Sequence, residues 1–243
     1  MNHNALRKSR GAVLPASLSC GLLKILRSIG LVLVIGVGMS ACVPNTYTWK
    51  EEVLLQDGGK LIAERTVVRG GGSEIGQEQQ IKEQSLTFTL PSTNERVSWE
   101  DKFTDDTGGE NFLPMLLEIR KDVAYLVVNS MAILSYNKWD QPNPPYVVFK
   151  YQGKTWKRIA LEELPREFTV PNLIFSSPDT EARKSGQSIV SAATIRKLYD
   201  GYEQPEFKSI LRTPIDRWKP RPQNIGPRAP NPVTSKGTIE NEK

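Results

Sequence analysis

The sequence predicts a mainly β protein: an antiparallel sandwich or open barrel of about eight strands, with one C-terminal helix and a disordered Pro-rich tail. Three observations predict this fold class. Short runs rich in β-branched and aromatic residues recur between residues 47 and 175, and tight-turn residues separate them. Only one later segment has helical periodicity. Many short strands joined by short turns are typical of sandwiches and barrels.

The first two predicted strands flank an Asp-Gly turn. Residues 49–55 precede Asp57-Gly58 and residues 61–68 follow it, which is the strongest short-range pattern for a β-hairpin. Residues 85–90 alternate strictly between polar and apolar side chains, and residues 96–99 form another β-rich run. We therefore expect the domain to open with antiparallel strands.

Four further strands complete the predicted eight. Residues 115–119 and 123–128 lie on either side of a polar Arg-Lys-Asp turn. Residues 146–151 and 155–161 are separated by a Gln-Gly-Lys turn. Short polar connections join antiparallel neighbours, so each pair is expected to form a hairpin.

The chain changes character after residue 175. Residues 176–211 are expected to form a loop plus one helix, packed on or near the β domain, because apolar residues recur at helical spacing over residues 188–199. Residues 212–243 hold six prolines among Arg, Lys and Asn, a composition typical of a disordered basic tail. The tail is either a plain disordered segment or an arm that touches acidic envelope polymers or a groove on a partner protein.

Residues 1–41 have the three parts of a secretory signal. Basic side chains flank the apolar residues 29–41, no acidic side chain occurs before Cys42, and small residues stand directly before it. The apolar segment of 13 residues is shorter than the roughly 20 that span a bilayer as a helix. Residues 39–42, Met-Ser-Ala-Cys, resemble the lipobox of bacterial lipoproteins. The alternatives are an uncleaved anchor over residues 22–39, or an ordinary signal whose removal leaves the cysteine unmodified.

The lipobox resemblance implies a lipid on Cys42. Residues 1–41 are then the signal peptide, Cys42 carries two or three acyl chains, and residues 42–46 link the anchor to the domain. Two or more chains hold a protein stably on a membrane. Val43 in place of Asp implies, by the sorting pattern of Gram-negative lipoproteins, the periplasmic face of the outer membrane. The expected partner is the membrane, reached through lipidated Cys42.

Cleavage before Cys42 changes both the charge and the chemistry of the chain. Five of the 32 basic side chains and none of the 27 acidic ones precede Cys42, so the remaining residues carry no net charge. A basic chain, which suggests nucleic acid binding, thus becomes neutral. His3 is the only histidine and Cys20 the only other cysteine, so imidazole and thiol chemistry are both lost. We expect no catalytic residue, no metal site, no cofactor and no nucleic acid partner.

Carboxylates are the remaining route to acid-base catalysis. A glycosidase needs two carboxyl groups roughly 5 to 9 Å apart across a cleft. Neighbours on a strand, such as Glu51 and Glu52, point to opposite faces and cannot form such a pair. A denser group of acids is expected to form an exposed loop. Its members are Glu100, Asp101, Asp105, Asp106 and Glu110.

A Pro-rich run over residues 139–146 holds the candidate binding residues. Its three prolines remove backbone donors, so the run is expected to form a stiff loop and not a central strand. In one interpretation, aromatic residues present their rings to a sugar or a peptide while Asp140 and Asn143 supply hydrogen bonds. In the other, the loop is a rigid corner and the rings pack on the domain edge. The aromatic residues are Tyr136, Trp139 and Tyr146.

Several runs of the chain resemble a family of uncharacterised proteobacterial lipoproteins. These runs are residues 49–58, 72–77, 111–118 and 136–151, followed by Leu164-Pro165 and Pro171-Asn-Leu173. The resemblance covers about residues 47–175 and implies one domain behind a lipid anchor. It implies no activity and no catalytic residue, because the family has none assigned.

These observations predict a membrane-anchored periplasmic lipoprotein that acts as a non-catalytic binding or structural module of the cell envelope. Its partner would be an envelope protein or a polysaccharide. One alternative is a carbohydrate-active enzyme that uses two carboxylates. Another is an accessory subunit that docks on an envelope complex through its strand edges or its basic tail.

Overall fold

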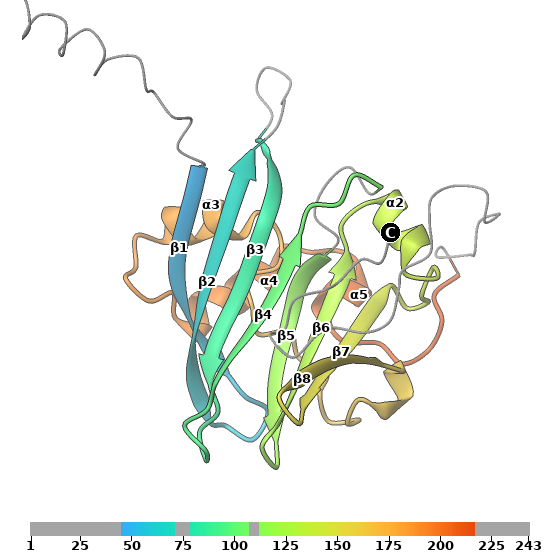
Figure 1. The fold of residues 1–243 in the computed structure, drawn as a ribbon, viewed down its shortest axis with the longest axis horizontal. Coiled ribbons are helices and arrows are strands. Elements are labelled where there is room, and N and C mark those ends of the chain that lie inside the picture. Colours follow the sequence, from blue (N-terminus) through green and yellow to red (C-terminus); the bar gives the residue numbers. More distant parts are fainter. Residues whose placement is uncertain (1–44, 71–77, 107–111, 217–243) are drawn as a thin grey trace, which may run out of the picture. The chain divides into compact units, whose positions relative to one another are not determined.

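The computed structural model describes residues 45–70, 78–106 and 112–216, and shows two antiparallel four-stranded sheets with several short helices (Figure 1). The first sheet contains β1 (Asn45–Leu54), β2 (Lys60–Gly70), β3 (Gln80–Thr89) and β4 (Arg96–Lys102). The second contains β5 (Phe112–Arg120), β6 (Val123–Ser130), β7 (Tyr146–Gln152) and β8 (Thr155–Ile159). The mainly β, antiparallel prediction is confirmed.

The helical segments are short. They are α2 (Ile133–Lys138), η1 (Leu161–Glu163), α3 (Pro178–Ser185), α4 (Ala192–Asp200) and α5 (Pro205–Lys208). No helix within the described ranges combines the length and apolar character that crossing a bilayer requires.

Turn chemistry at the predicted hairpins matches the backbone that forms there. Gly58 adopts φ +87°, and the Asp57 carboxylate accepts a hydrogen bond of 2.8 Å from the Gly59 N–H. Between β5 and β6, Lys121 and Asp122 both have positive φ, which a tight two-residue hairpin requires. These turns set the strand register, and the register decides which side chains enter the core.

The two sheets pack face to face around a shared apolar core. Leu86 and Trp99 from the first sheet meet Leu126 and Phe149 from the second in this core. The Trp99 and Phe149 rings lie 6.3 Å apart between centroids. Alternate residues of each strand supply this face, as the period of a β-strand dictates. Of the two predicted architectures, the sandwich describes this arrangement.

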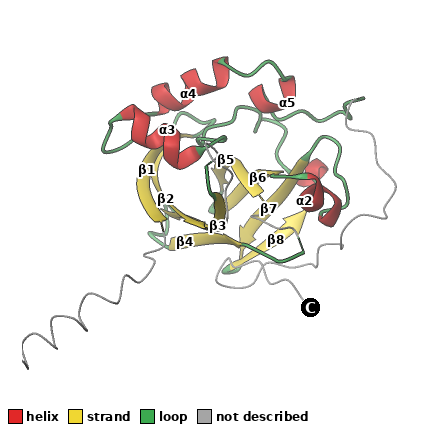
Figure 2. Cartoon of the chain, turned by 90° about the horizontal axis from the view of Figure 1, so that it is seen from above, coloured by secondary structure: helices red, strands yellow, loops and turns green. Residues whose placement is uncertain are grey.

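Helices cover the other face of the second sheet. Val127 and Val148 point to that face and belong to a second apolar cluster together with Ile195 and Tyr199 of α4. Figure 2 shows α3, α4 and α5 together on one side of the strands. Because both faces of the second sheet are covered, β5 and β6 are apolar at nearly every position and almost completely buried.

The outer face of the first sheet is polar, and its edge strand is partly covered. Outward positions of β1 alternate with buried ones, so Thr48, Lys50 and Glu52 remain accessible. At the free edge of β1, the Val190 N–H donates to the Lys50 carbonyl and the Glu52 N–H donates to the Val190 carbonyl, both at 2.8 Å. This contact covers backbone groups that would otherwise be open to another strand.

The structure differs from the sequence prediction at several boundaries. Asn45 and Thr46 already pair with β2, so the expected linker over residues 42–46 reaches into β1. One helix was expected after residue 175, yet the described part of that segment holds three. The sequence pattern did not predict α3, which is polar, or α5, which has a single turn, because neither has a long apolar stripe.

The acidic loop and the start of the tail were also predicted incorrectly. Asp101 is fully buried because it points inward from β4, where its carboxylate accepts the Phe112 N–H at 3.0 Å. The tail was expected to begin at residue 212, but Arg212 and Ile215 are hydrogen-bonded to the domain. Glu110, the signal peptide, Cys42 and residues 217–243 lie outside the described residues.

Candidate functional site

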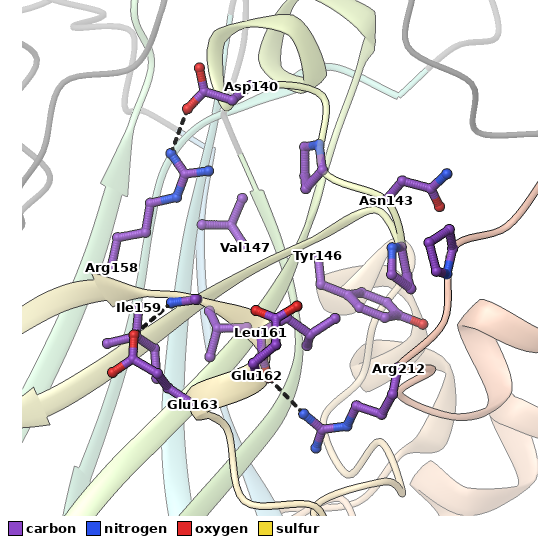
Figure 3. Close-up of a pocket in the computed structure, with 15 residues that line it drawn as sticks. Asp140, Asn143, Tyr146, Val147, Arg158, Ile159, Leu161, Glu162, Glu163 and Arg212 are labelled. Atoms are coloured by element: carbon purple, nitrogen blue, oxygen red, sulfur yellow. Dashed lines mark hydrogen bonds and ion pairs between the residues drawn. The ribbon is translucent and has the colours of Figure 1, made fainter.

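A groove of about 490 Å³ lies beside the predicted binding loop (Figure 3). We call it the β7–β8 groove. Its walls come from the loop after α2, the start of β7, the end of β8, η1 and the segment around Arg212 and Pro214. Three residues of the predicted surface line it, namely Asp140, Asn143 and Tyr146.

The groove exists because β7 is longer than its edge partner. The pairing of β7 with β8 stops at Val148 opposite Ile159, whereas β7 starts two residues earlier, at Tyr146. After Ile159 the chain turns away into η1, whose entry is held by the Glu163 carboxylate accepting the Ala160 N–H at 3.0 Å. The start of β7 is thus left without a neighbouring strand on that side. Val147, Val148 and Ile159 give the groove an apolar wall.

Arg158 and Asp140 form a charged pair on one side of the groove. The Arg158 guanidinium lies 2.9 Å from the Asp140 carboxylate and also donates to the Trp139 carbonyl at 3.1 Å. The same guanidinium lies 5.6 Å from the centre of the Trp139 ring. The Asp140 side chain is exposed, whereas the Trp139 side chain is buried. This pair therefore fixes the loop to β8 and leaves a carboxylate accessible to a ligand.

Arg212 closes the opposite side of the groove as a clamp. Its guanidinium donates to four backbone carbonyls at 2.7 to 3.2 Å. The acceptors are Leu161, Leu164, Pro165 and Phe168. Burial lowers the pKa of this guanidinium, and an arginine side chain stays protonated in proteins. The positive charge is therefore engaged in holding the chain after β8, and Figure 3 shows it reaching toward Leu161.

Asn143 and Tyr146 attach the last described segment to the loop. The Asn143 amide donates to the Ile215 carbonyl at 3.0 Å and accepts from the Ile215 N–H at 2.7 Å. The Tyr146 hydroxyl donates to the Glu206 carbonyl at 2.7 Å, and burial raises its pKa. Both polar groups are thus occupied within the protein. The groove is held in shape by its own hydrogen bonds before any ligand arrives.

The aromatic rings of the predicted surface are almost completely buried, including that of Tyr146, which lines the groove. Tyr136, Trp139 and Tyr146 are all buried, and Trp139 is only 1% exposed. The Trp139 ring packs against Phe112 with 4.6 Å between centroids. The interpretation that the loop presents aromatic faces to a sugar or a peptide is therefore wrong for these rings. The alternative, a rigid corner packed on the domain edge, agrees with the structure.

Sequence reasoning missed Arg158 and Arg212 as residues of the groove. Arg158 lies two residues after buried Trp156 and therefore on the same face of β8, and no local pattern marks this charged residue as part of a groove. Arg212 was assigned to the tail because of the prolines that follow. The apolar pair Ile210-Leu211 just before it was the available signal, since Ile210 is buried in the helical layer.

A second, smaller cavity of about 250 Å³ lies on the outer face of the first sheet. Glu83 and Glu100 both line it, together with Lys102. Glu83 pairs with Lys102 and Ser85 with Glu100, so the two carboxylates are diagonal neighbours on one face. Diagonal neighbours lie roughly 7 to 8 Å apart in a sheet. Within the described residues, no second layer covers this face to enclose a substrate.

Buried acids elsewhere serve the fold. Glu51 is fully buried, lies 3.1 Å from Arg65, and accepts from the Trp49 indole N–H at 2.7 Å. Burial raises the pKa of Glu118 to about 8, and its carboxylate accepts from Gln56 and Asn172. These acids line neither cavity. In the described part of the chain, no cluster of three or more His, Cys, Asp or Glu residues is arranged to hold a metal.

No protein-family model, no curated protein and no solved structure matches the chain. The resemblance to proteobacterial lipoproteins therefore stays a prediction.

Proposed function

We propose that the protein is a non-catalytic module of the cell envelope, anchored by lipid on Cys42, which binds a polypeptide partner in the β7–β8 groove. The observation that carries the proposal is the groove itself. It is preformed, it has an apolar wall, and Arg158 and Asp140 stand at its side as a charged pair. Such a mixture of apolar surface and few fixed polar groups is typical of ligand sites.

The burial of the aromatic rings favours a polypeptide over a polysaccharide. A sugar face commonly stacks on an accessible aromatic ring, and none of the three predicted rings is accessible. A polypeptide instead needs apolar contacts together with charged and backbone hydrogen-bonding groups. The groove offers apolar contact at Val147 and Ile159 and charge at Asp140 and Glu162.

The lipid anchor is supported by sequence and by the position of the first strand. Residues 39–42 resemble a lipobox, and β1 begins only three residues after Cys42. A folded domain that follows the modified cysteine this closely would stay at the membrane surface. Anchoring and binding then serve one role, which is to hold a partner beside the membrane.

A photocrosslinking experiment tests the binding site in cells. A photoreactive amino acid replaces Glu162 in the groove, and a matched variant carries it at exposed Lys121, in the turn between β5 and β6. We expect a discrete adduct from position 162 that protease removes and muramidase leaves intact. Adducts of equal yield at both positions, or an adduct that muramidase removes, would contradict a polypeptide in the groove.

A further inference from the structure

We propose that the end of the sandwich at which β1 begins faces the membrane, and that the exposed apolar loop over residues 131–133 rests in the lipid surface. This orientation rests on the proposed acylation of Cys42. It adds a second membrane contact, from the folded domain, to the lipid anchor.

The first argument is the length of the tether. Asn45 opens β1 and stands three residues after Cys42. An extended chain covers at most about 3.6 Å per residue, so the tether reaches about 11 Å. β1 has ten residues, so its far end at Leu54 lies about 30 Å further along the strand. An acylated Cys42 therefore keeps the start of β1 near the lipid headgroups.

The second argument places the apolar loop at the same end of the molecule. A row of paired residues crosses the first sheet from Tyr47 through Val67 and Gln84 to Asp101. The row continues into the second sheet, because Asp101 accepts the Phe112 N–H and Phe112 pairs with Ser130. Ser130, the last residue of β6, thus lies level with Tyr47, only two residues from the start of β1.

The chain passes beyond that row directly after Ser130. Met131, Ala132 and Ile133, the first residue of α2, therefore lie at the end of the sandwich that the tether holds. Figure 1 shows the start of β1 and α2 at the upper end, and the turn between β1 and β2 at the lower end.

The third argument is the chemistry of the loop. Residues 131–133 are Met-Ala-Ile, and all three are exposed. Met131 is 47% and Ile133 43% exposed, which places them among the most exposed large apolar residues of the described chain. Single exposed apolar side chains are common on protein surfaces. Two of them in one loop, at the end nearest an acyl anchor, are suited to contact with lipid.

Ile62 provides a matched comparison. It is 42% exposed, and it lies on the outer face of the first sheet opposite Glu52. Glu52 is seven residues from Asn45, so Ile62 lies about 23 Å from the start of β1 along the sheet. If the domain instead lay flat with the outer face of the first sheet on the membrane, Ile62 would touch lipid.

Site-directed labelling of the acylated full chain tests the orientation. Acylation blocks the thiol of Cys42 and Cys20 leaves with the signal peptide, so Ile133→Cys or Ile62→Cys supplies the one reactive thiol. Each variant is labelled with an environment-sensitive fluorophore and reconstituted into phosphatidylethanolamine and phosphatidylglycerol vesicles containing spin-labelled lipid. Met131→Cys is the second loop variant, and circular dichroism checks that every variant is folded.

We expect the fluorophores at positions 131 and 133 to be quenched about threefold more strongly than the one at position 62, as for side chains that enter the headgroup boundary. Equal quenching, or stronger quenching at position 62, on an acylated protein would overturn the orientation and leave the anchor intact. A mass that shows an unmodified Cys42 would overturn both the orientation and the proposed anchor.

Discussion

At the scale of single residues, the interior holds an ion pair between Glu51 and Arg65. Both side chains are at most 1% exposed. Glu51 also accepts the Ile174 N–H, and Arg65 donates to the Ile174 carbonyl at 2.6 Å. The pair therefore fastens β1 and β2 to the segment that leads into the helical layer. Such pairs fix the relative positions of the elements they join more than they stabilise the fold. Losing one partner, however, leaves an uncompensated buried charge.

Removing one charge of this pair should destabilise the fold strongly. Glu51→Gln is expected to lower the free energy of unfolding by about 3 to 5 kcal/mol, because Arg65 stays buried without its carboxylate. Chemical denaturation followed by fluorescence measures the change. The double variant Glu51→Leu with Arg65→Met should recover part of the loss.

Glu52 is the matched control on the same strand. It lies 3.0 Å from Lys60, and both side chains are partly or largely exposed. Glu52→Gln should change the free energy of unfolding by less than about 1 kcal/mol. An equal effect of the two substitutions would show that burial of the Glu51 charge is not what determines stability.

Glu118 should give the protein a measurable pH dependence. Its pKa is raised from 4.5 to about 8 by burial, so the folded state keeps a proton that the unfolded state releases above about pH 4.5. The free energy of unfolding should therefore fall as pH rises from about 4.5 to 8. In Glu118→Gln this fall should be smaller, as denaturation at pH 5 and pH 8 will show.

The direction of the pH dependence distinguishes the contribution of Glu118 from that of Asp179. Burial acts on Asp179 as well, but the paired Arg69 guanidinium outweighs it and lowers the Asp179 pKa from 3.8. Asp179 therefore contributes stability that is lost as pH falls below 3.8, in the opposite direction and in a different window. An unchanged slope between pH 5 and pH 8 in Glu118→Gln would assign the dependence to other groups.

At the scale of elements, the Arg212 clamp fastens the segment after α5 to the domain. Arg212→Ala should lower the free energy of unfolding by about 1 to 3 kcal/mol, since four carbonyls lose their donor. Thermal unfolding measures the change, and exposed Lys208→Ala is the control, with little expected effect. An equal melting temperature for both variants would show that the Arg212 hydrogen bonds do not stabilise the domain.

Strand elements were predictable from the sequence because local chemistry determines them. The Asp57-Gly58 turn and the alternation over β3 are local signals that can be read from a few neighbouring residues. Short helices were less predictable. In α2, Ser135 and Lys138 are buried polar residues, so its pattern shows no apolar stripe. Packing against the strands, and not helix propensity, stabilises such segments.

The candidate site was only partly predictable at the scale of the whole molecule. Prolines marked residues 139–146 as a stiff loop, and Asp140, Asn143 and Tyr146 do line the groove. Burial of the aromatic rings could not be read from the loop, because it depends on Phe112 and Phe149 in other strands. Arg158 and Arg212 join the site only after β8 and the last described segment fold beside β7.

The layered architecture is compatible with the proposed role as an anchored module. The second sheet is enclosed between the first sheet and the helices, so the core needs no disulfide. The groove lies at the edge of that enclosed sheet, where hydrogen bonds of Glu163, Arg212 and Asn143 hold its walls. In the proposed function, a partner bound there is held by the domain that a lipid on Cys42 would anchor to the membrane.

The mass of the N-terminal peptide tests the central claim, that Cys42 carries a lipid anchor, most directly. Protein extracted from membranes is digested, and its N-terminal peptide is analysed by mass spectrometry. Our account predicts that residues 1–41 are absent and that Cys42 carries a diacylglyceryl group. An intact N-terminus, or a Cys42 without lipid, would contradict the account.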